Sequence, residues 1–132
     1  MVGIVIVSHS EKIAEGTVEL CAQMADAGVR LMAAGGTADH RIGTDAERIA
    51  TAIREADSGY GVLVLVDLGS AVLSTDLAFE LLDDAVRERA AIADAPLVEG
   101  AVAATVAASM GSDLQTVKAT AEESREMSKL EA

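Results

Sequence analysis

The sequence predicts an α/β fold, a three-layer sandwich with a central, mostly parallel four-stranded sheet. Gly3–Val7 and Val62–Val66 are short apolar runs rich in Val, Ile and Leu, as is typical of strands buried on both faces of a parallel sheet. Segments with helical spacing of apolar residues separate the predicted strands. This alternation indicates strands joined by right-handed helical crossovers.

The first predicted helix follows Ser10 and ends near Gly28. Either Ser8 or Ser10 can cap its start, and Ser8 with Glu11 has the spacing of a capping box. Val29–Ala33 predicts a second strand that is less apolar than the first, so we expect it at an edge of the sheet. The helix itself is predicted from apolar residues at helical spacing, namely Ile13, Val18, Cys21, Met24 and Ala25.

Residues 34–43 form the longest predicted loop, because they contain three glycines and no sustained periodicity. Long loops in compact domains are often functional. Thr44 and Glu47 have the spacing of a capping box and predict a second helix that continues to about Asp57.

The remainder of the chain predicts a third helix, a weak fourth strand at 90–93 and two further helices. Pro96 marks the start of a helix at 97–110 that is mostly Ala and Val, and we expect it to lie against the sheet or a partner subunit. Ser112 and Gln115 predict a capping box for the last helix. The third helix is predicted from the apolar residues Val72, Leu73, Leu77, Leu81 and Leu82.

Length and composition fit one domain over residues 1–132 of a cytoplasmic protein. The net charge of -12 argues against a nucleic-acid partner, because phosphate backbones are bound chiefly through clustered Lys and Arg. No apolar run approaches the roughly 20 residues that span a membrane, and no basic leader precedes the apolar start. The single cysteine, Cys21, cannot form an internal disulfide, and we interpret it as a core residue.

Two polar side chains stand directly after the two most apolar strands. His9 follows the first of these strands and Asp67 the second, at the carboxyl ends where open α/β sheets bind ligands. If flavodoxin-like winding makes the strands neighbours, His9 and Asp67 come within contact distance. A carboxylate on one imidazole nitrogen fixes the tautomer and leaves the other nitrogen as a nucleophile, which predicts attack by His9 on phosphorus.

The same edge offers groups for phosphoryl oxygens. Ser10 at the start of the first helix, the Gly69 amide and Ser70 are candidate phosphate ligands. The long loop adds further candidate contacts, which are Gly35, Gly36 and Thr37.

These residues also allow other interpretations. A histidine at a strand end is often only a loop residue, and His40 is interpreted as a solvated one. No metal site is predicted, because His9, His40 and Asp67 share no spacing that would preform one. Neither glycine-rich nucleotide-binding signature occurs, so no cofactor is expected.

Several stretches together resemble the phosphotransferase subunits of dihydroxyacetone kinases, which in turn resemble mannose-type IIA domains of the sugar phosphotransferase system. The resemblance covers nearly the whole chain up to about Gly111. Leu68–Ala71 stands where the transporter relatives carry Trp-Gly-Gly-Ser-Pro, which favours the kinase branch. The stretches, in order, are Gly3–Ser10 with Glu15 and Gly16, Ala33–Gly36, Ile42–Asp45, Val66–Ala71 and Ala95–Gly100.

This resemblance implies a phosphorelay protein. His9 is expected to accept a phosphoryl group on Nε2 from phospho-HPr, which enzyme I charges from phosphoenolpyruvate, with Asp67 on the Nδ1 side. The group is then expected to pass to ADP on the nucleotide-binding subunit of the kinase, and the ATP formed phosphorylates dihydroxyacetone on a third subunit. The relatives are homodimers, which suggests a partner surface on the helix at 97–110. Because some relatives continue into HPr-like and enzyme I-like domains, and this chain ends at Ala132, we expect a separate donor protein.

Alternative functions remain open at this point. The same pocket could serve a regulatory module that senses a phosphorylated partner or small anion without turnover, or a IIA-type phosphocarrier in sugar transport. A flavodoxin-like domain that binds a cofactor is a third alternative. The lack of a phosphate-loop signature and the low aromatic content, 2%, weigh against flavin binding.

Overall fold

The structure, a computed structural model, describes residues 1–130 of the chain. Its elements in chain order are β1 Gly3–Ser8, α1 Glu11–Ala22, β2 Leu31–Gly35, α2 Ala46–Ala56, β3 Val62–Val66, α3 Gly69–Glu80, α4 Asp84–Glu88, β4 Ala90–Ile92, α5 Leu97–Ser109, α6 Leu114–Glu123 and the 3-10 turn η1 Ser124–Glu126.

All four strands are parallel and lie in the order β2-β1-β3-β4. The predicted α/β class, the parallel sheet and the flavodoxin-like winding are confirmed, with β2 at an edge and β1 beside β3. Every residue of β1 is buried, as its apolar run predicts. The winding brings the ends of β1 and β3 side by side, although a whole helix–strand–helix segment separates them in sequence.

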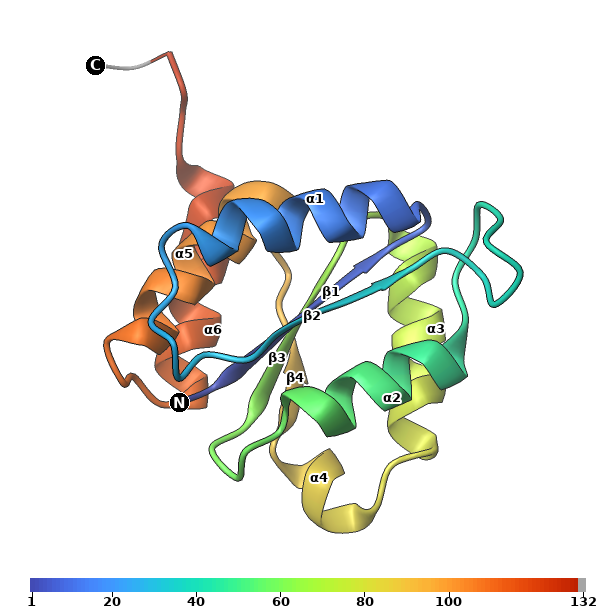
Figure 1. Cartoon of the computed structure of the whole chain (residues 1–132). Coiled ribbons are helices and arrows are strands. Elements are labelled where there is room, and N and C mark those ends of the chain that lie inside the picture. The colour runs from blue at the N-terminus through green and yellow to red at the C-terminus, as the bar shows by residue number, and fades with distance from the viewer. Residues whose placement is uncertain (131–132) are drawn as a thin grey trace.

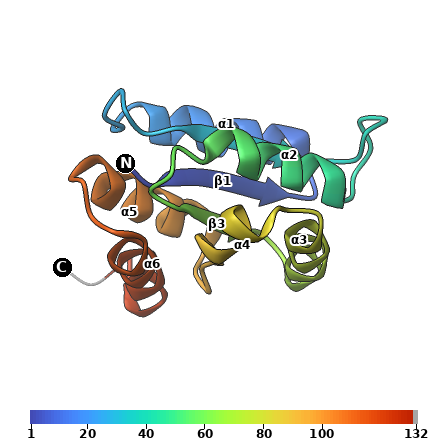
Figure 2. The same ribbon diagram turned by 90° about the horizontal axis from the view of Figure 1, so that it is seen from below.

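The sheet is covered on both faces, which makes the predicted three layers (Figure 1). Because side chains alternate along a strand, Ile4 and Ile6 pack in the core under α1, α5 and α6, whereas Val5 and Val7 pack under α2 and α3. In Figure 2 the head of β1 points to the side of the molecule that holds α3 and the loop after β2. Within residues 1–130, no helix has the length and apolar character to span a membrane.

The structure decides between the two caps predicted for α1 and differs from the caps predicted for α2 and α6. Ser10 caps α1, because its hydroxyl accepts from the Ile13 amide, while the Ser8 hydroxyl is engaged elsewhere. Asp45, not Thr44, caps α2, and Asp113, not Ser112, caps α6. In both corrections the true cap is the aspartate that follows the predicted residue, and a carboxylate accepts amide hydrogen bonds well.

Two elements have boundaries that differ from the predicted ones. Helix α1 ends at Ala22, earlier than the predicted Gly28, and residues 23–30 form the turn that leads into β2. Strand β2 begins at Leu31 and runs to Gly35, two residues later than predicted.

The apolar stripe predicted for the third helix is not the buried face of α3. Its buried face consists of small residues, Ala71, Thr75 and Ala78, which permit close packing on the sheet and on α2. Leu73, Leu77 and Leu81 are instead exposed, although Leu82 is buried. Apolar residues are distributed around the helix and are not confined to one face, so apolar spacing alone could not identify its buried face.

Helix α5 packs against the sheet, the first of the two alternatives predicted for it. Its Ala-rich face, including Ala101, Ala104 and Ala108, lies in the core with β1, β3 and α6. That face is therefore used within the chain, and the partner surface expected on this helix stays a prediction for its exposed side. Cys21 is buried in the same core, and burial raises the pKa of its thiol.

Candidate functional site

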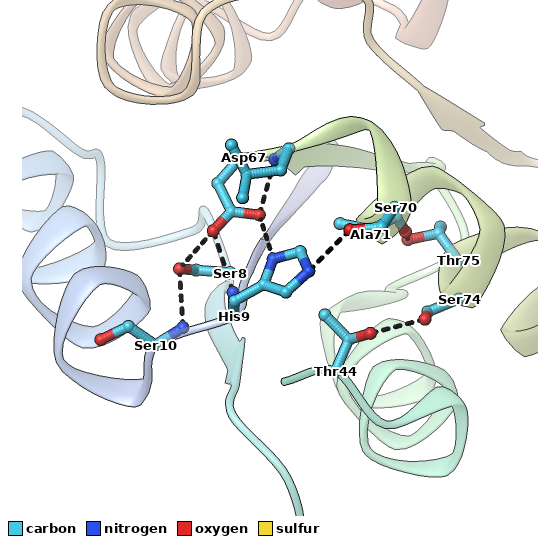
Figure 3. A network of polar contacts seen from close by, with 10 residues as sticks. Ser8, His9, Ser10, Thr44, Asp67, Ser70, Ala71, Ser74 and Thr75 are labelled. Carbon is cyan, nitrogen blue, oxygen red and sulfur yellow. Dashed lines mark hydrogen bonds and ion pairs between the residues drawn. The ribbon is translucent and has the colours of Figure 1, made fainter. Parts of the chain in front are cut away.

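The strand register brings three polar residues together at the carboxyl edge of the sheet. β1 and β3 pair with Val7 opposite Val66, so the next residues, Ser8 and Asp67, lie level with each other. His9 follows one residue further along. The predicted contact is present: His9 Nδ1 lies 2.9 Å from Asp67 Oδ1 (Figure 3).

Asp67 is held by a complete set of hydrogen bonds. Its Oδ2 accepts from the Ser8 hydroxyl at 2.8 Å and from the His9 amide at 2.9 Å, and its Oδ1 accepts from the Leu68 amide at 2.7 Å. Partial burial disfavours the charged carboxylate, but the hydrogen bonds from His9, Ser8 and Leu68 outweigh it and lower its pKa. Asp67 is therefore a fixed anion at neutral pH.

This anion sets the tautomer of His9. Because an ionised carboxylate only accepts hydrogen bonds, Nδ1 carries the proton of the neutral imidazole, and Nε2 carries the lone pair. Nε2 lies 2.8 Å from the Ser70 hydroxyl, which donates to it. The His9 side chain is 21% exposed, so Nε2 is oriented from behind and can be reached from solvent. This arrangement suits a nucleophile.

The other predicted phosphate ligands differ in their positions. Gly69 and Ser70 open α3 and are exposed, Ser70 lies on the Nε2 side, and the side chain of the cap residue Leu68 makes no hydrogen bond to the amides of the first turn. Their amides can therefore receive an anion. Ser10 lies on the opposite side of the ring, and its amide and hydroxyl bond to Ser8 and Ile13 (Figure 3).

The predicted loop contacts serve the loop itself. Gly36 donates its amide to the Ser8 carbonyl, and the Thr37 amide and hydroxyl bond to Arg41 and Asp39. A Cβ on Gly35 would lie 2.7 Å from the Ser10 carbonyl oxygen, so glycine allows β2 to approach the start of α1. These three positions shape the loop and its approach to the start of α1.

His40 lies apart from His9. It is an exposed residue with a positive φ of 64°, and its Nδ1 lies 2.7 Å from the Glu11 carboxylate. Among the residues that the structure describes, His, Cys, Asp and Glu side chains form no group of three or more that could hold a metal ion.

Two site residues were not identified from the sequence. Ser8 was considered only as a helix cap, yet its buried hydroxyl contacts Asp67. Thr44 was also considered only as a cap, yet its hydroxyl lies 2.5 Å from that of Ser74 in α3. Their positions in the chain could have indicated a role in the site. Ser8 ends a buried strand, and Thr44 ends the loop that returns to His9.

Comparison with known proteins agrees with this site. Residues 3–118 match the EIIA-man family model, described as the PTS system fructose IIA component. The phosphoryl donor subunit DhaM of PEP-dependent dihydroxyacetone kinase 2 from Listeria innocua is 45% identical over 106 residues, covering 80% of this chain and 85% of that protein. The chain belongs to the EIIA-man family.

Two further relatives extend the comparison. DhaM of the PEP-dependent dihydroxyacetone kinase from Escherichia coli is 42% identical over 120 residues, covering 89% of this chain but only 25% of that protein. A crystal structure titled unknown function protein EF1359 has a TM-score of 0.82 and 38% identity, covering 93% of this chain and 95% of that one. The predicted resemblance to the dihydroxyacetone kinase branch of the EIIA-man family is confirmed.

Proposed function

We propose that the chain is a phosphoryl carrier that accepts a phosphoryl group on His9 Nε2 from phospho-HPr. It then passes the group to ADP bound to the nucleotide-binding subunit of a dihydroxyacetone kinase. The relatives named as phosphoryl donor subunits of this kinase support the proposal.

The observation that carries the proposal is the 2.9 Å hydrogen bond between Asp67 and His9 Nδ1. It keeps the lone pair on Nε2, where it accepts from the Ser70 hydroxyl in this structure. Once that hydroxyl turns away, the lone pair can form a bond to phosphorus while the P–N bond of the donor breaks. The electron pair of the broken bond stays with the donor's ring nitrogen, so the step needs no general base. Return of the group to a second acceptor uses the same geometry in reverse.

The first prediction is a label on His9. Incubation with phosphoenolpyruvate, enzyme I and HPr is expected to give one acid-labile phosphate per chain, measured by phosphohistidine assay or intact mass. His9→Gln is expected to remove the label, whereas His40→Gln, the matched control, is expected to keep it. Equal labelling of wild type and His9→Gln would contradict the proposal.

A second stage tests the acceptor. The labelled chain is mixed with the nucleotide-binding and dihydroxyacetone-binding subunits and ADP, and dihydroxyacetone phosphate is measured. Its formation supports the kinase role. Labelling without transfer to ADP would instead favour the sugar-transport carrier or the phosphate-sensing module.

A further inference from the structure

A pair of hydroxyl groups near His9 links two elements that are distant in the sequence. Thr44 Oγ1 and Ser74 Oγ lie 2.5 Å apart and join the loop after β2 to α3 (Figure 3). Asp45 caps α2 with its own carboxylate, so Thr44 is not needed as a cap. Both side chains are partly buried.

Two contacts place this pair near His9. The Gly43 amide donates to the His9 carbonyl at 2.9 Å, which places the next residue, Thr44, against His9. Ser74 lies four residues after Ser70 and therefore on the same face of α3, and Ser70 contacts Nε2. Figure 3 shows the pair on the Nε2 side of the ring, across from Ser70.

One hydroxyl of the pair can donate a hydrogen bond to a third group. When two hydroxyls bond to each other, one donates its proton, and the other keeps a proton free for a third group. A phosphoryl group on Nε2 carries three oxygens beside the negative Asp67, so donors are needed to offset the repulsion. Hydroxyls supply neutral hydrogen bonds, which are weaker than those of Arg and suit a group that must leave again.

We infer that Thr44 and Ser74 bind the phosphoryl group of phospho-His9, together with Ser70. This inference rests on the proposed function and adds two ligands to it. The P–Nε2 bond forms as described above, and the hydroxyl protons remain on their own oxygens throughout. The phosphorylated state is thereby stabilised relative to the phosphorylated donor.

The experiment compares Thr44→Val and Ser74→Ala with wild type after chemical phosphorylation by phosphoramidate. The half-life of phospho-His9 and its phosphorus NMR shift are measured, followed by the equilibrium ratio of phosphorylated chain to phosphorylated HPr. Loss of one hydrogen bond is expected to lower that ratio by about two- to ten-fold and to move the phosphorus shift. Thr44→Ser, which keeps the hydroxyl, is expected to retain the wild-type values.

Controls separate binding from a structural clamp. Thr120→Val removes a hydroxyl that bonds within α6, to the Thr116 carbonyl, and is expected to leave phospho-His9 unchanged. Melting temperatures of all variants are measured in parallel. A lower melting temperature with wild-type half-life, phosphorus shift and equilibrium ratio would overturn the inference, as would failure of phosphoramidate to modify His9. Labelling by phosphoramidate without labelling by phospho-HPr would contradict the proposed function alone.

Discussion

At the scale of single residues, the buried hydroxyl of Ser8 positions the carboxylate that positions His9. It donates to Asp67 Oδ2 at 2.8 Å and accepts from the Ser10 amide at 3.0 Å, so both its proton and a lone pair are used. Ser8 has no access to solvent, and water therefore cannot replace it without a rearrangement. A change at Ser8 should reach the reacting nitrogen only through Asp67.

Ser8→Ala is expected to slow phosphoryl transfer to His9 on the order of ten-fold, equivalent to about 1.4 kcal/mol, because Asp67 loses one of its donors. The same loss is expected to raise the pKa of Asp67, because a hydrogen bond to the charged form lowers it. Rapid-quench kinetics and an NMR titration of the carboxyl carbon measure the two effects. Ser8→Thr keeps the hydroxyl and should restore both; unchanged values in Ser8→Ala would exclude a positioning role.

The residue scale also marks the limit of what the sequence could predict about the site. His9 and Asp67 could be identified because each follows an apolar strand that is plain in the sequence. The partners of Ser8 and Thr44 could not, because a hydroxyl's partner depends on the register of β1 against β3 and on the path of a loop. Neither quantity is encoded in local spacing.

At the scale of elements, the helix starts show how neighbouring residues compete for one role. Thr44 and Asp45 are both good cap residues, and the helical repeat does not tell which of them ends the loop. The structure assigns the cap of α2 to Asp45, whose Oδ1 accepts from the Glu47 and Arg48 amides. Thr44 is thereby left to face α3.

Asp45→Ala is expected to destabilise the chain by about 1 kcal/mol, the usual effect of losing a helix cap. Thr44→Ala is expected to lower the free energy of unfolding by less, because it leaves that cap in place. Urea unfolding followed by circular dichroism measures both. A larger loss in Thr44→Ala than in Asp45→Ala would contradict this assignment of the cap.

At the scale of the whole molecule, the alternation of strands and helices predicted a layered, parallel architecture, but it could not predict which face of each helix is buried. Helix α3 turns its small residues to the sheet and leaves Leu73 and Leu77 exposed, since close packing rewards small side chains. The short helix α4, Asp84–Glu88, was not predicted because five residues are too few for a periodic signal. Packing against the sheet and α2 decides which face of α3 is buried.

At the amino edge of the sheet, opposite His9, an ion pair joins the end of α2 to the start of β4. Asp57 ends α2 and is 6% exposed, and its carboxylate accepts from Arg89, just before β4, at 2.7 to 3.0 Å. The Arg89 hydrogen bonds lower the pKa of Asp57 despite partial burial, which opposes its ionisation. The pair therefore stabilises the fold fully above the unfolded-state pKa of about 3.9, and this stabilisation is lost as the pH falls through the lower folded-state value.

Asp57→Asn is accordingly expected to reduce the free energy of unfolding at pH 7 by about 1.5 to 3 kcal/mol, the range for hydrogen bonds to charged groups. The difference from wild type should shrink as the pH falls from the unfolded-state pKa through the lower folded-state pKa, because the wild-type carboxylate becomes neutral over this range. Urea unfolding at pH 7 and through the acid range measures this change. Asp84→Asn breaks an exposed pair with Arg87 and should change stability by no more than about 0.5 kcal/mol. A pH-independent difference for Asp57→Asn would show that the charge of Asp57 does not hold α2 to β4.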